Sequence, residues 1–306
     1  MARYILQRLL LSLPVLLLVV TLSFIIFYVI PGDPALLMVS PDASYAEVEA
    51  LRRALGLTDP LYVQYVRYLG EVVRLDFGSS LRTGLPVLEE IQVRYPNTFL
   101  LAGAGMLIAV VLGLAAGLIS AARHNTWLDR LLTLLVLVGV STPVFWLGFI
   151  LMLIFSATLL WLPSGGTGTI AHLILPAATL GLHSTADIAR VTRASMLEVL
   201  RQDYIRTARA KGVREFLVLN WHGLRNALIP IVTMIGIRFG TLLGGVVLVE
   251  NVFAWPGIGR LMVDALRVRD YPVVHGAALL LAVTVVVLNL LVDLSYARLD
   301  PRVRFD

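Results

Sequence analysis

The sequence has no cysteine and only one lysine among its 306 residues. Without cysteine there can be no disulfide framework, no thiolate metal site and no thiol nucleophile. The lysine, Lys211, is followed by glycine rather than by Ser or Thr, so the chain lacks a Walker A motif, whose lysine reaches the phosphates. Charged residues are also scarce, at 15% of the chain against about 25% in soluble proteins. The chain therefore carries no ATPase of the Walker type and does not have the composition of a soluble domain.

Apolar residues are abundant instead. The chain is 58% hydrophobic with a mean hydropathy of +0.85, more than one core of this size can bury. The five histidines are scattered, with no H-E-x-x-H motif and no close pair at helix-face metal spacing. The net charge of +5 is better explained by membrane topology than by nucleic-acid binding. We predict an all-α integral membrane protein that holds no metal and binds no nucleic acid.

A membrane-spanning helix needs about 20 mostly apolar residues. The first candidate run is longer than the core of a signal peptide and no A-x-A site follows it, so we interpret it as a retained span. The fourth is the most polar, since it contains His183 and Asp187. The six predicted spans are Leu9–Ile30, Thr98–Ala121, Leu131–Trp161 (as one tilted or extended helix), His172–Ala189, Leu228–Val249 and Gly276–Tyr296.

The distribution of Arg and Lys predicts the orientation. With both termini in the cytoplasm, fifteen of these residues fall in cytoplasmic segments and nine in outer segments. Six of the nine lie in the first outer segment, which is long enough to cross the membrane regardless of its charge. We therefore expect both termini of this multi-pass chain to be cytoplasmic.

The outer segment, residues 31–97, separates the first span (residues 1–30) from a core of five helices (residues 98–306). It predicts two short helices. Ser44–Leu55 begins with a capping box formed by Ser44 and Glu47, and Gly56 ends it. The second, Pro60–Leu75, has apolar residues at helical spacing. We expect an ordered outer cap, and the residues leave open whether it is a plain surface or a substrate site.

Ionisable residues at membrane depth are costly and are candidates for function. Glu250 and Arg190 lie near the ends of spans, where they could simply extend to the interface. For Asp293 a buried structural pair and a pore role both stay open. Gly236, Gly240 and Gly244 share a helix face that packs either within the chain or against a partner. The pore candidates are Asp187, Arg238, Glu250 and Asp293.

One enzymatic alternative needs two residues on separate spans. Ser141 and His275 could form the Ser–His dyad of an intramembrane serine protease. However, Gly-x-Ser is a common string and Pro143 follows closely, so Ser141 is better explained as bonding to its own helix. Gly257 and Gly259 lack the strand and the third glycine of a dinucleotide loop and predict a re-entrant turn. A stand-alone carrier is the remaining alternative.

The segment 190–227 is basic and amphipathic. Ser195–Ala210 predicts one helix with an apolar stripe, Gly212 ends it, and Val213–Asn226 predicts a second amphipathic helix. Such a pair could dock into a groove of another protein or lie on lipid headgroups, and the residues alone leave both open.

Long strings in this sequence resemble the inner-membrane permease subunits of ABC importers, within the dipeptide/oligopeptide/nickel group. The strings at Val252–Leu266 and Arg269–Val274 are similar to those of glutathione and dipeptide permeases. The resemblance covers essentially the whole chain. The matching strings are IPGDP (30–34), DFGSSLRTGLPV (76–87), RVTRASMLEVLRQDYIRTARAKG (190–212), HGLRNALIP (222–230), VFAWPGIGRLMVDAL (252–266), RDYPVV (269–274) and NLLVDLSYARLDPRVR (289–304).

The resemblance implies the type I (MetI-like) importer permease fold in a bacterial or archaeal cytoplasmic membrane. The basic loop would be the EAA motif, whose coupling helix docks on an ATPase. Arg206 stands in place of the motif's glutamate, as in peptide permeases, and the motif's later proline is replaced by Arg225. The implied coupling residues are Tyr204, Arg206, Thr207, Ala208, Ala210, Lys211 and Gly212, and the implied bracing residues are His222, Arg225 and Asn226.

The resemblance also implies partners. A homologous second permease would complete a heterodimeric pore, two ATP-binding subunits would carry ATP and Mg, and an extracytoplasmic solute-binding protein would deliver a peptide-like substrate. This chain itself would hold no cofactor and would be no enzyme. The resemblance leaves the substrate open: it could be a dipeptide, an oligopeptide, glutathione, a nickel chelate or an oligosaccharide.

Overall fold

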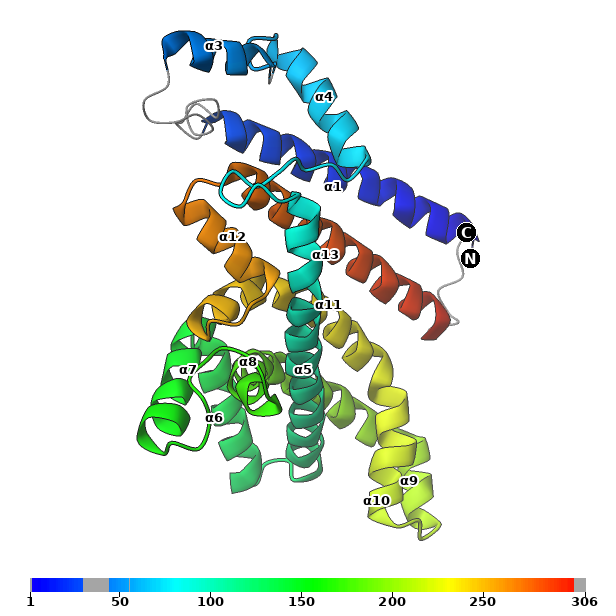
Figure 1. The fold of residues 1–306 in the computed structure, drawn as a ribbon. Coiled ribbons are helices and arrows are strands. Elements are labelled where there is room, and N and C mark those ends of the chain that lie inside the picture. The colour runs from blue at the N-terminus through cyan, green and yellow to red at the C-terminus, as the bar shows by residue number, and fades with distance from the viewer. Residues whose placement is uncertain (1, 30–43, 55, 300–306) are drawn as a thin grey trace. The chain divides into compact units, whose positions relative to one another are not determined.

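The computed structural model describes the backbone of residues 2–29, 44–54 and 56–299 and the side chains of residues 10–26, 44–54 and 56–292. Within these ranges the chain is helical, and its only β pairing is an isolated bridge between Ser79 and Pro86. The helices are labelled in Figure 1. The all-α prediction is confirmed. The IPGDP string at 30–34 and the tail after Leu299 lie outside the described residues.

The predicted number of spans is not confirmed. Among the described residues, three helical runs are long and apolar enough to cross a membrane. They are α5 (Val87–Ala122), the run Glu215–Val252 and Tyr271–Val292 of α13 (Tyr271–Leu299). A bent helix pair brings the number to four, and α1 (Ala2–Val29) has a shorter apolar run. As far as they are described, five of the six predicted spans fall on helical residues, whereas the third is interrupted at Thr142 and Pro143 and runs three residues past the end of its helix.

The predicted third span is two helices rather than one. α6 (Trp127–Ser141) and α7 (Val144–Leu151) are bent by 109° at a break, and a π-helix, η1 (Met152–Thr158), continues α7. Thr142 has an extended backbone (φ −88°, ψ 122°) because proline disfavours the α conformation in the residue before it. Pro143 also has no N–H to continue the ladder. A single tilted helix is therefore excluded by the Thr142-Pro143 pair.

The predicted fourth span and the start of the basic loop form one helix. α8 runs from Ile170 to Leu200, 31 residues, so the helix continues ten residues past the start of the predicted loop at Arg190. The expected helix Ser195–Ala210 is interrupted, since Gln202 is extended and a separate helix, α9 (Asp203–Ala210), follows it. The second amphipathic segment is a short helix, α10 (Glu215–Leu217), and a π-helix, η2 (Val218–Leu224), which lead without a break into α11 (Arg225–Val252).

The first of two compact units comprises residues 1–6, 96–260 and 285–306. Its centre is α8, which packs against α6, α7 and α11. Glycines of α5 let α8 approach closely: a Cβ at Gly117 would lie 2.5 Å from Thr192 Cβ. In the predicted glycine stripe, Gly236 and Gly240 face α13 in the same chain, whereas a Cβ at Gly244 would meet nothing within 4 Å. Packing within the chain thus accounts for two of the three glycines.

The second unit comprises residues 7–95 and 261–284. It contains the predicted cap helices, α3 (Tyr45–Ala54) and α4 (Leu61–Val73). The capping box is confirmed, because the Ser44 N–H donates to Glu47 Oε2 (2.7 Å) and the Glu47 N–H donates to Ser44 Oγ (3.3 Å). Gly56, with φ +65°, follows α3 as expected. α12 (Ile258–Arg267) enters this unit with its last seven residues.

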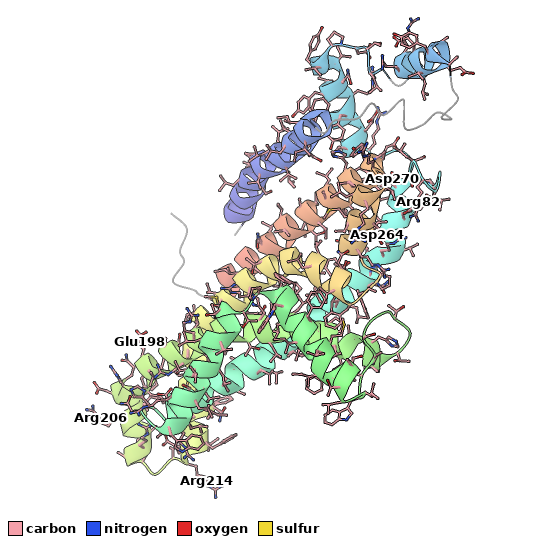
Figure 2. All side chains as sticks on the ribbon, turned by 90° about the vertical axis from the view of Figure 1, so that its left-hand side faces the viewer. Arg82, Glu198, Arg206, Arg214, Asp264 and Asp270 are labelled. Atoms are coloured by element: carbon pink, nitrogen blue, oxygen red, sulfur yellow. The ribbon has the colours of Figure 1, made fainter. Side chains whose placement is uncertain are left out.

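The matching strings DFGSSLRTGLPV and RDYPVV meet in the second unit. Asp270 is 3% exposed and accepts hydrogen bonds from Ser80 Oγ and from the Leu81 N–H. The labels of Asp270 and Arg82 mark this node in Figure 2. Because a buried carboxylate needs such partners, the node explains why the two distant strings occur together.

Candidate functional site

The first part of the candidate site is α9 with the turn that follows it. Ile205 and Ala208 on its inner face are buried against Val218 of η2. The helix ends as predicted: Gly212 has φ +76°, a conformation that glycine adopts without a steric cost. The Val213 N–H donates to the Ala208 carbonyl (3.2 Å), which satisfies one of the last carbonyls of the helix. The turn is thus held by the apolar packing of Ile205 and Ala208 on Val218 and by the backbone hydrogen bond from Val213 to Ala208.

An ion pair joins the two sides of this turn. Arg209 donates from Nε and Nη2 to the two carboxylate oxygens of Glu215, at 3.1 and 2.6 Å. These hydrogen bonds hold the pKa of the Glu215 carboxyl below its ordinary value and raise the pKa of Arg209. Both side chains are about half exposed, 44% and 55%, so solvent screens the pair and its stabilisation is modest, about 0.5 kcal/mol. At neutral pH the pair is charged and holds α10 close to α9.

Most of the predicted coupling residues share the exposed side of this element. Tyr204 is 43% exposed, and Arg206 (83% exposed) forms an ion pair with Asp203 (95% exposed) at 3.5 Å. Figure 2 shows Arg206 and Arg214 projecting from this end. Ala208 differs from the expectation, because it is 8% exposed and packs inward. The exposed members of the predicted set are Tyr204, Arg206, Thr207, Ala210, Lys211 and Gly212.

The sequence reasoning missed three apolar side chains beside them. Phe216 is 73% exposed, Trp221 63% and Leu217 48%. Aromatic residues are enriched at protein interfaces, and their occurrence in a basic segment is the signal that could have indicated them. We call Tyr204, Phe216, Leu217 and Trp221, with the exposed residues 206–214, the α9 surface.

The predicted bracing residues make local contacts. The Arg225 guanidinium lies 5.4 Å from the centre of the Trp221 ring. The Asn226 amide donates to the His222 carbonyl at 2.8 Å. A Cβ on the neighbouring Gly223 would lie 2.9 Å from Met196 Cε. These contacts tie η2 to α11 and let η2 lie against α8, but the role of the three residues in bracing the loop stays a prediction.

The second part of the candidate site comprises the charged residues in or beside the predicted fourth and fifth spans. Two of the predicted pore residues form an ion pair, with Arg238 Nη2 at 2.6 Å from Asp187 Oδ2. Arg190 Nη2 is 3.6 Å from the other oxygen of Asp187. His183 lies one turn before Asp187 on the same side of α8. The side chain of Asp293 lies outside the described residues.

Glu250 has a different environment. It is fully buried and accepts hydrogen bonds from Thr98 Oγ1 (2.7 Å) and the Arg260 N–H (3.1 Å). Thr98 Oγ1 in turn accepts from the Ile258 N–H at 2.9 Å. A Cβ at Gly257 would lie 1.9 Å from Glu250 Oε1. Glu250 therefore does not extend to an interface, and it anchors the predicted turn through Gly257 and Gly259. A pore role for it stays a prediction.

A third buried charge was not predicted from the sequence. Asp129 is 3% exposed, and Arg193 donates to both of its oxygens from Nε (2.8 Å) and Nη2 (2.9 Å). Ser120 Oγ and the Asn125 N–H (3.0 Å) also donate to it. This pair joins the turn between α5 and α6 to α8, eight residues before α8 ends at its cap residue Arg201. Its two members are 64 residues apart, which is why no local motif indicated them.

The residues of the enzymatic alternative have other surroundings. His275 Nδ1 is 2.7 Å from Ser23 Oγ, and Ser141 is exposed at the end of α6. The described residues contain no group of three or more His, Cys, Asp or Glu side chains that could hold a metal ion.

Comparison with known families identifies the kind of protein. Residues 109–305 match the family of binding-protein-dependent transport system inner membrane components, and residues 1–102 match the N-terminal domain of such components. The chain belongs to this family. It is the permease subunit of an ABC importer and not an enzyme. A permease of this kind works with ATPase subunits and with a substrate-binding protein, and in bacteria it lies in the inner membrane.

Relatives match along the full length of the permease. It is 48% identical to the glutathione transport system permease protein GsiC of Pectobacterium atrosepticum, over 100% of both chains. Proteins of the same name from Salmonella paratyphi A and Escherichia coli K12 are 47% and 46% identical, again over 100% of both chains.

Solved structures confirm the fold of the permease. A chain of the methionine ABC transporter MetNI in an inward-facing conformation aligns with a TM-score of 0.57 at 20% identity. A chain of an amino acid ABC transporter with histidines aligns with a TM-score of 0.56 at 16% identity. Each alignment covers 69% of this permease and 94% of the other chain. The fold is therefore that of ABC importer permeases.

Proposed function

We propose that this permease forms half of the translocation pore of an ATP-driven importer for di- and oligopeptides, including glutathione. The observation that carries the substrate class is the 46–48% identity, over the full length, to permeases named for glutathione transport. The other half of the pore is a homologous permease, two ATPase subunits carry ATP and Mg, and a solute-binding protein delivers the substrate from outside. Both chain termini face the cytoplasm, and the outer cap with α3 and α4 faces the binding protein.

Coupling to the ATPases takes place through the α9 surface. The support is physical: an eight-residue helix is held rigidly by a buried apolar contact and an ion pair, and it exposes apolar and cationic side chains beside a glycine turn. When ATP closes the ATPase pair, a rigid surface of this kind transmits the movement to α8 and α11. Such rigid-body switching moves the pore between its two states. Asp187 and Arg238 line the pore in this proposal, and Glu250 and Asp293 remain candidates.

The experiment is reconstitution of the complete importer in proteoliposomes. We expect ATP-dependent uptake of glutathione or of dipeptides when the liganded binding protein is present, and ATP hydrolysis stimulated by it. Uptake of neither glutathione nor any di- or oligopeptide, with a correctly assembled complex, would refute the substrate class. A chain that assembles with no ATPase would refute the coupling role.

Gly212→Asp tests the α9 surface directly. Gly212 and Gly84 both have positive φ, +76° and +71°, and a Cβ at either one would meet nothing within 4 Å. The same substitution therefore causes similar backbone strain at both positions, but only Gly212 lies in the proposed docking surface. Gly212→Asp should reach the membrane and lose binding of the ATPase subunits, ATP hydrolysis and uptake, whereas Gly84→Asp, in the outer segment, should keep binding of the ATPase subunits. Normal uptake by Gly212→Asp would contradict the docking role.

A further inference from the structure

The Asp187–Arg238 pair lies inside the helical core between α8 and α11. Arg238 is in the middle of the predicted fifth span, and the two charged groups are 2.6 Å apart. Neither is fully enclosed by this chain, since 15% of the Asp187 side chain and 32% of the Arg238 side chain are exposed. Charged groups at membrane depth face a bundle interior or a water-filled path rather than lipid. The open side of this pair therefore belongs to a polar path.

The hydrogen-bonding capacity of this pair is largely unused. Within the described residues, Arg238 Nε is buried without a hydrogen-bond partner, and so is Nδ1 of His183. Arg238 carries five N–H donors, and its contact with Asp187 uses one nitrogen. The second oxygen of Asp187 has only Arg190 at 3.6 Å. Buried polar groups in native structures are satisfied with few exceptions, so the open donors require an explanation.

The other buried pair in the same unit shows what a structural pair looks like. Asp129 and Arg193 meet through two charge-assisted hydrogen bonds, and Asp129 has two further donors in Ser120 and Asn125. Asp129 is 4% exposed at its side chain, compared with 15% for Asp187. The contrast between a saturated pair and an open pair in one unit indicates that Asp187 and Arg238 do more than stabilise the fold.

We propose that Asp187 and Arg238 form a binding station for zwitterions, which exchange their own charges with those of the resident pair. The carboxylate of an amino-acid or peptide terminus takes the place of Asp187 at the Arg238 guanidinium, at the Nη end that Asp187 contacts. The ammonium group of the same ligand takes the place of Arg238 at Asp187. His183 offers a further polar contact from the same face of α8.

This exchange leaves no charge unpaired, because two internal partners are replaced by two external ones. The net charge of the station plus a zwitterion is zero before and after binding. A singly charged ligand would break the resident pair and leave one buried charge without a partner, which is unfavourable. The station therefore selects molecules that carry both charges. The proposal rests on the proposed import function and specifies the substrate chemistry that the pore itself recognises.

The first test is a neutral polar pair, Asp187→Asn with Arg238→Gln. The complete importer is reconstituted, and both peptide uptake and ATP hydrolysis are measured. We expect the number of peptides imported per ATP hydrolysed to fall at least tenfold. A ratio within twofold of the wild type would overturn the proposal, and so would a parallel loss of hydrolysis and uptake in an assembled complex, which would indicate a role in switching. A wild-type complex without stimulated hydrolysis would refute the proposed function instead.

The second test measures binding directly and uses the absence of cysteine in this chain. Thr241 is exposed and lies one turn after Arg238 on the same face of α11. In Thr241→Cys a water-soluble thiol reagent should label this chain, and a dipeptide with free termini should slow the labelling at least threefold. The same dipeptide acetylated and amidated at its ends should not slow it. Equal protection by both peptides, or no labelling, would overturn the proposal. Leu134→Cys, on an apolar exposed face of α6, should not be labelled.

Discussion

Asp129→Asn is the substitution whose effect can be worked out most fully from the geometry. Each carboxylate oxygen of Asp129 accepts two hydrogen bonds: Oδ1 from Ser120 Oγ and Arg193 Nε, and Oδ2 from the Asn125 N–H and Arg193 Nη2. An asparagine has one carbonyl oxygen and one amide NH₂ group. At the Oδ2 position the NH₂ group would face two donors, and at the Oδ1 position it would face the Arg193 Nε–H while the Ser120 hydroxyl can turn to accept from it. The substitution therefore removes at least one hydrogen bond and leaves the Arg193 charge without its counter-ion.

The expected loss follows from the burial of the two partners. Removing one member of a fully buried ion pair costs about 3–5 kcal/mol. Asp129 is enclosed, but the side chain of Arg193 is 31% exposed, so water partly compensates its lost partner. We therefore expect Asp129→Asn to lower the free energy of unfolding by about 2–3 kcal/mol, somewhat less than for a fully buried pair. This corresponds to a decrease of about 30- to 150-fold in the ratio of folded to unfolded protein.

The measurement is equilibrium unfolding of the purified permease in mixed micelles with increasing denaturing detergent, followed by circular dichroism. Asp203→Asn is the matched control, because its pair with Arg206 is almost fully exposed (95% and 83%) and contributes less than about 1 kcal/mol. Combining Asp129→Asn with Arg193→Gln should cost less than the sum of the two single changes, because the second change removes the unpaired charge. If Asp129→Asn and Asp203→Asn were equally stable, the reasoning about the buried pair would be refuted.

Three further predictions concern other parts of the chain. Gly257→Ala should destabilise the permease by about 1–3 kcal/mol in the same unfolding assay, because its Cβ would collide with the buried Glu250 carboxylate; Gly244→Ala, which has open space, is the control, and equal stability of the two variants would argue against the Glu250 anchor. Phe216→Ala should weaken co-purification of the ATPase subunit at least tenfold while changing stability by less than about 0.5 kcal/mol, because Phe216 is 73% exposed; the control Leu85→Ala, at a residue 51% exposed in the outer segment, should leave co-purification unchanged. Unaltered binding of the ATPase subunit by Phe216→Ala would show that Phe216 is not part of the docking surface. Ser44→Ala should speed hydrogen exchange of the first-turn amides of α3 about fivefold, as expected for the loss of about 1 kcal/mol of N-cap stabilisation, and unchanged exchange would show that Glu47 alone holds the cap.

Two predictions that depend only on residues close together in the sequence were correct. The Ser44–Glu47 capping box and the end of α9 before Gly212 were both predicted correctly, because each depends on backbone groups within a few residues. The class of protein was also clear, since hydropathy and the matching strings extend along the whole chain. The length of single helices was less clear: Pro143 was noted, but its separation of α6 from α7 by 109° was not.

Helix boundaries at the basic loop could not be read from composition. The increase in positive charge at Arg190 suggested that a span had ended, yet α8 continues to Leu200. It continues because Met196, one turn beyond Arg193, is buried against Ala121, Ala227 and Ile231, which come from α5 and α11. Tertiary packing of this kind overrides the local pattern of charges. The burial of Ala208, predicted as a contact residue, has the same origin in its packing on Val218.

By itself the sequence determined an all-helical membrane permease, and it predicted the position of a coupling element and a list of costly charges in the predicted spans. Only the tertiary structure decided which charges meet. Asp187 and Arg238 are 51 positions apart, Asp129 and Arg193 are 64 apart, and Glu250 and Thr98 are 152 apart. The physical reason is that the environment of a buried charge is set by whichever helices pack around it. No local pattern distinguishes the saturated pair at Asp129 from the anchored carboxylate of Glu250 or the open pair at Asp187.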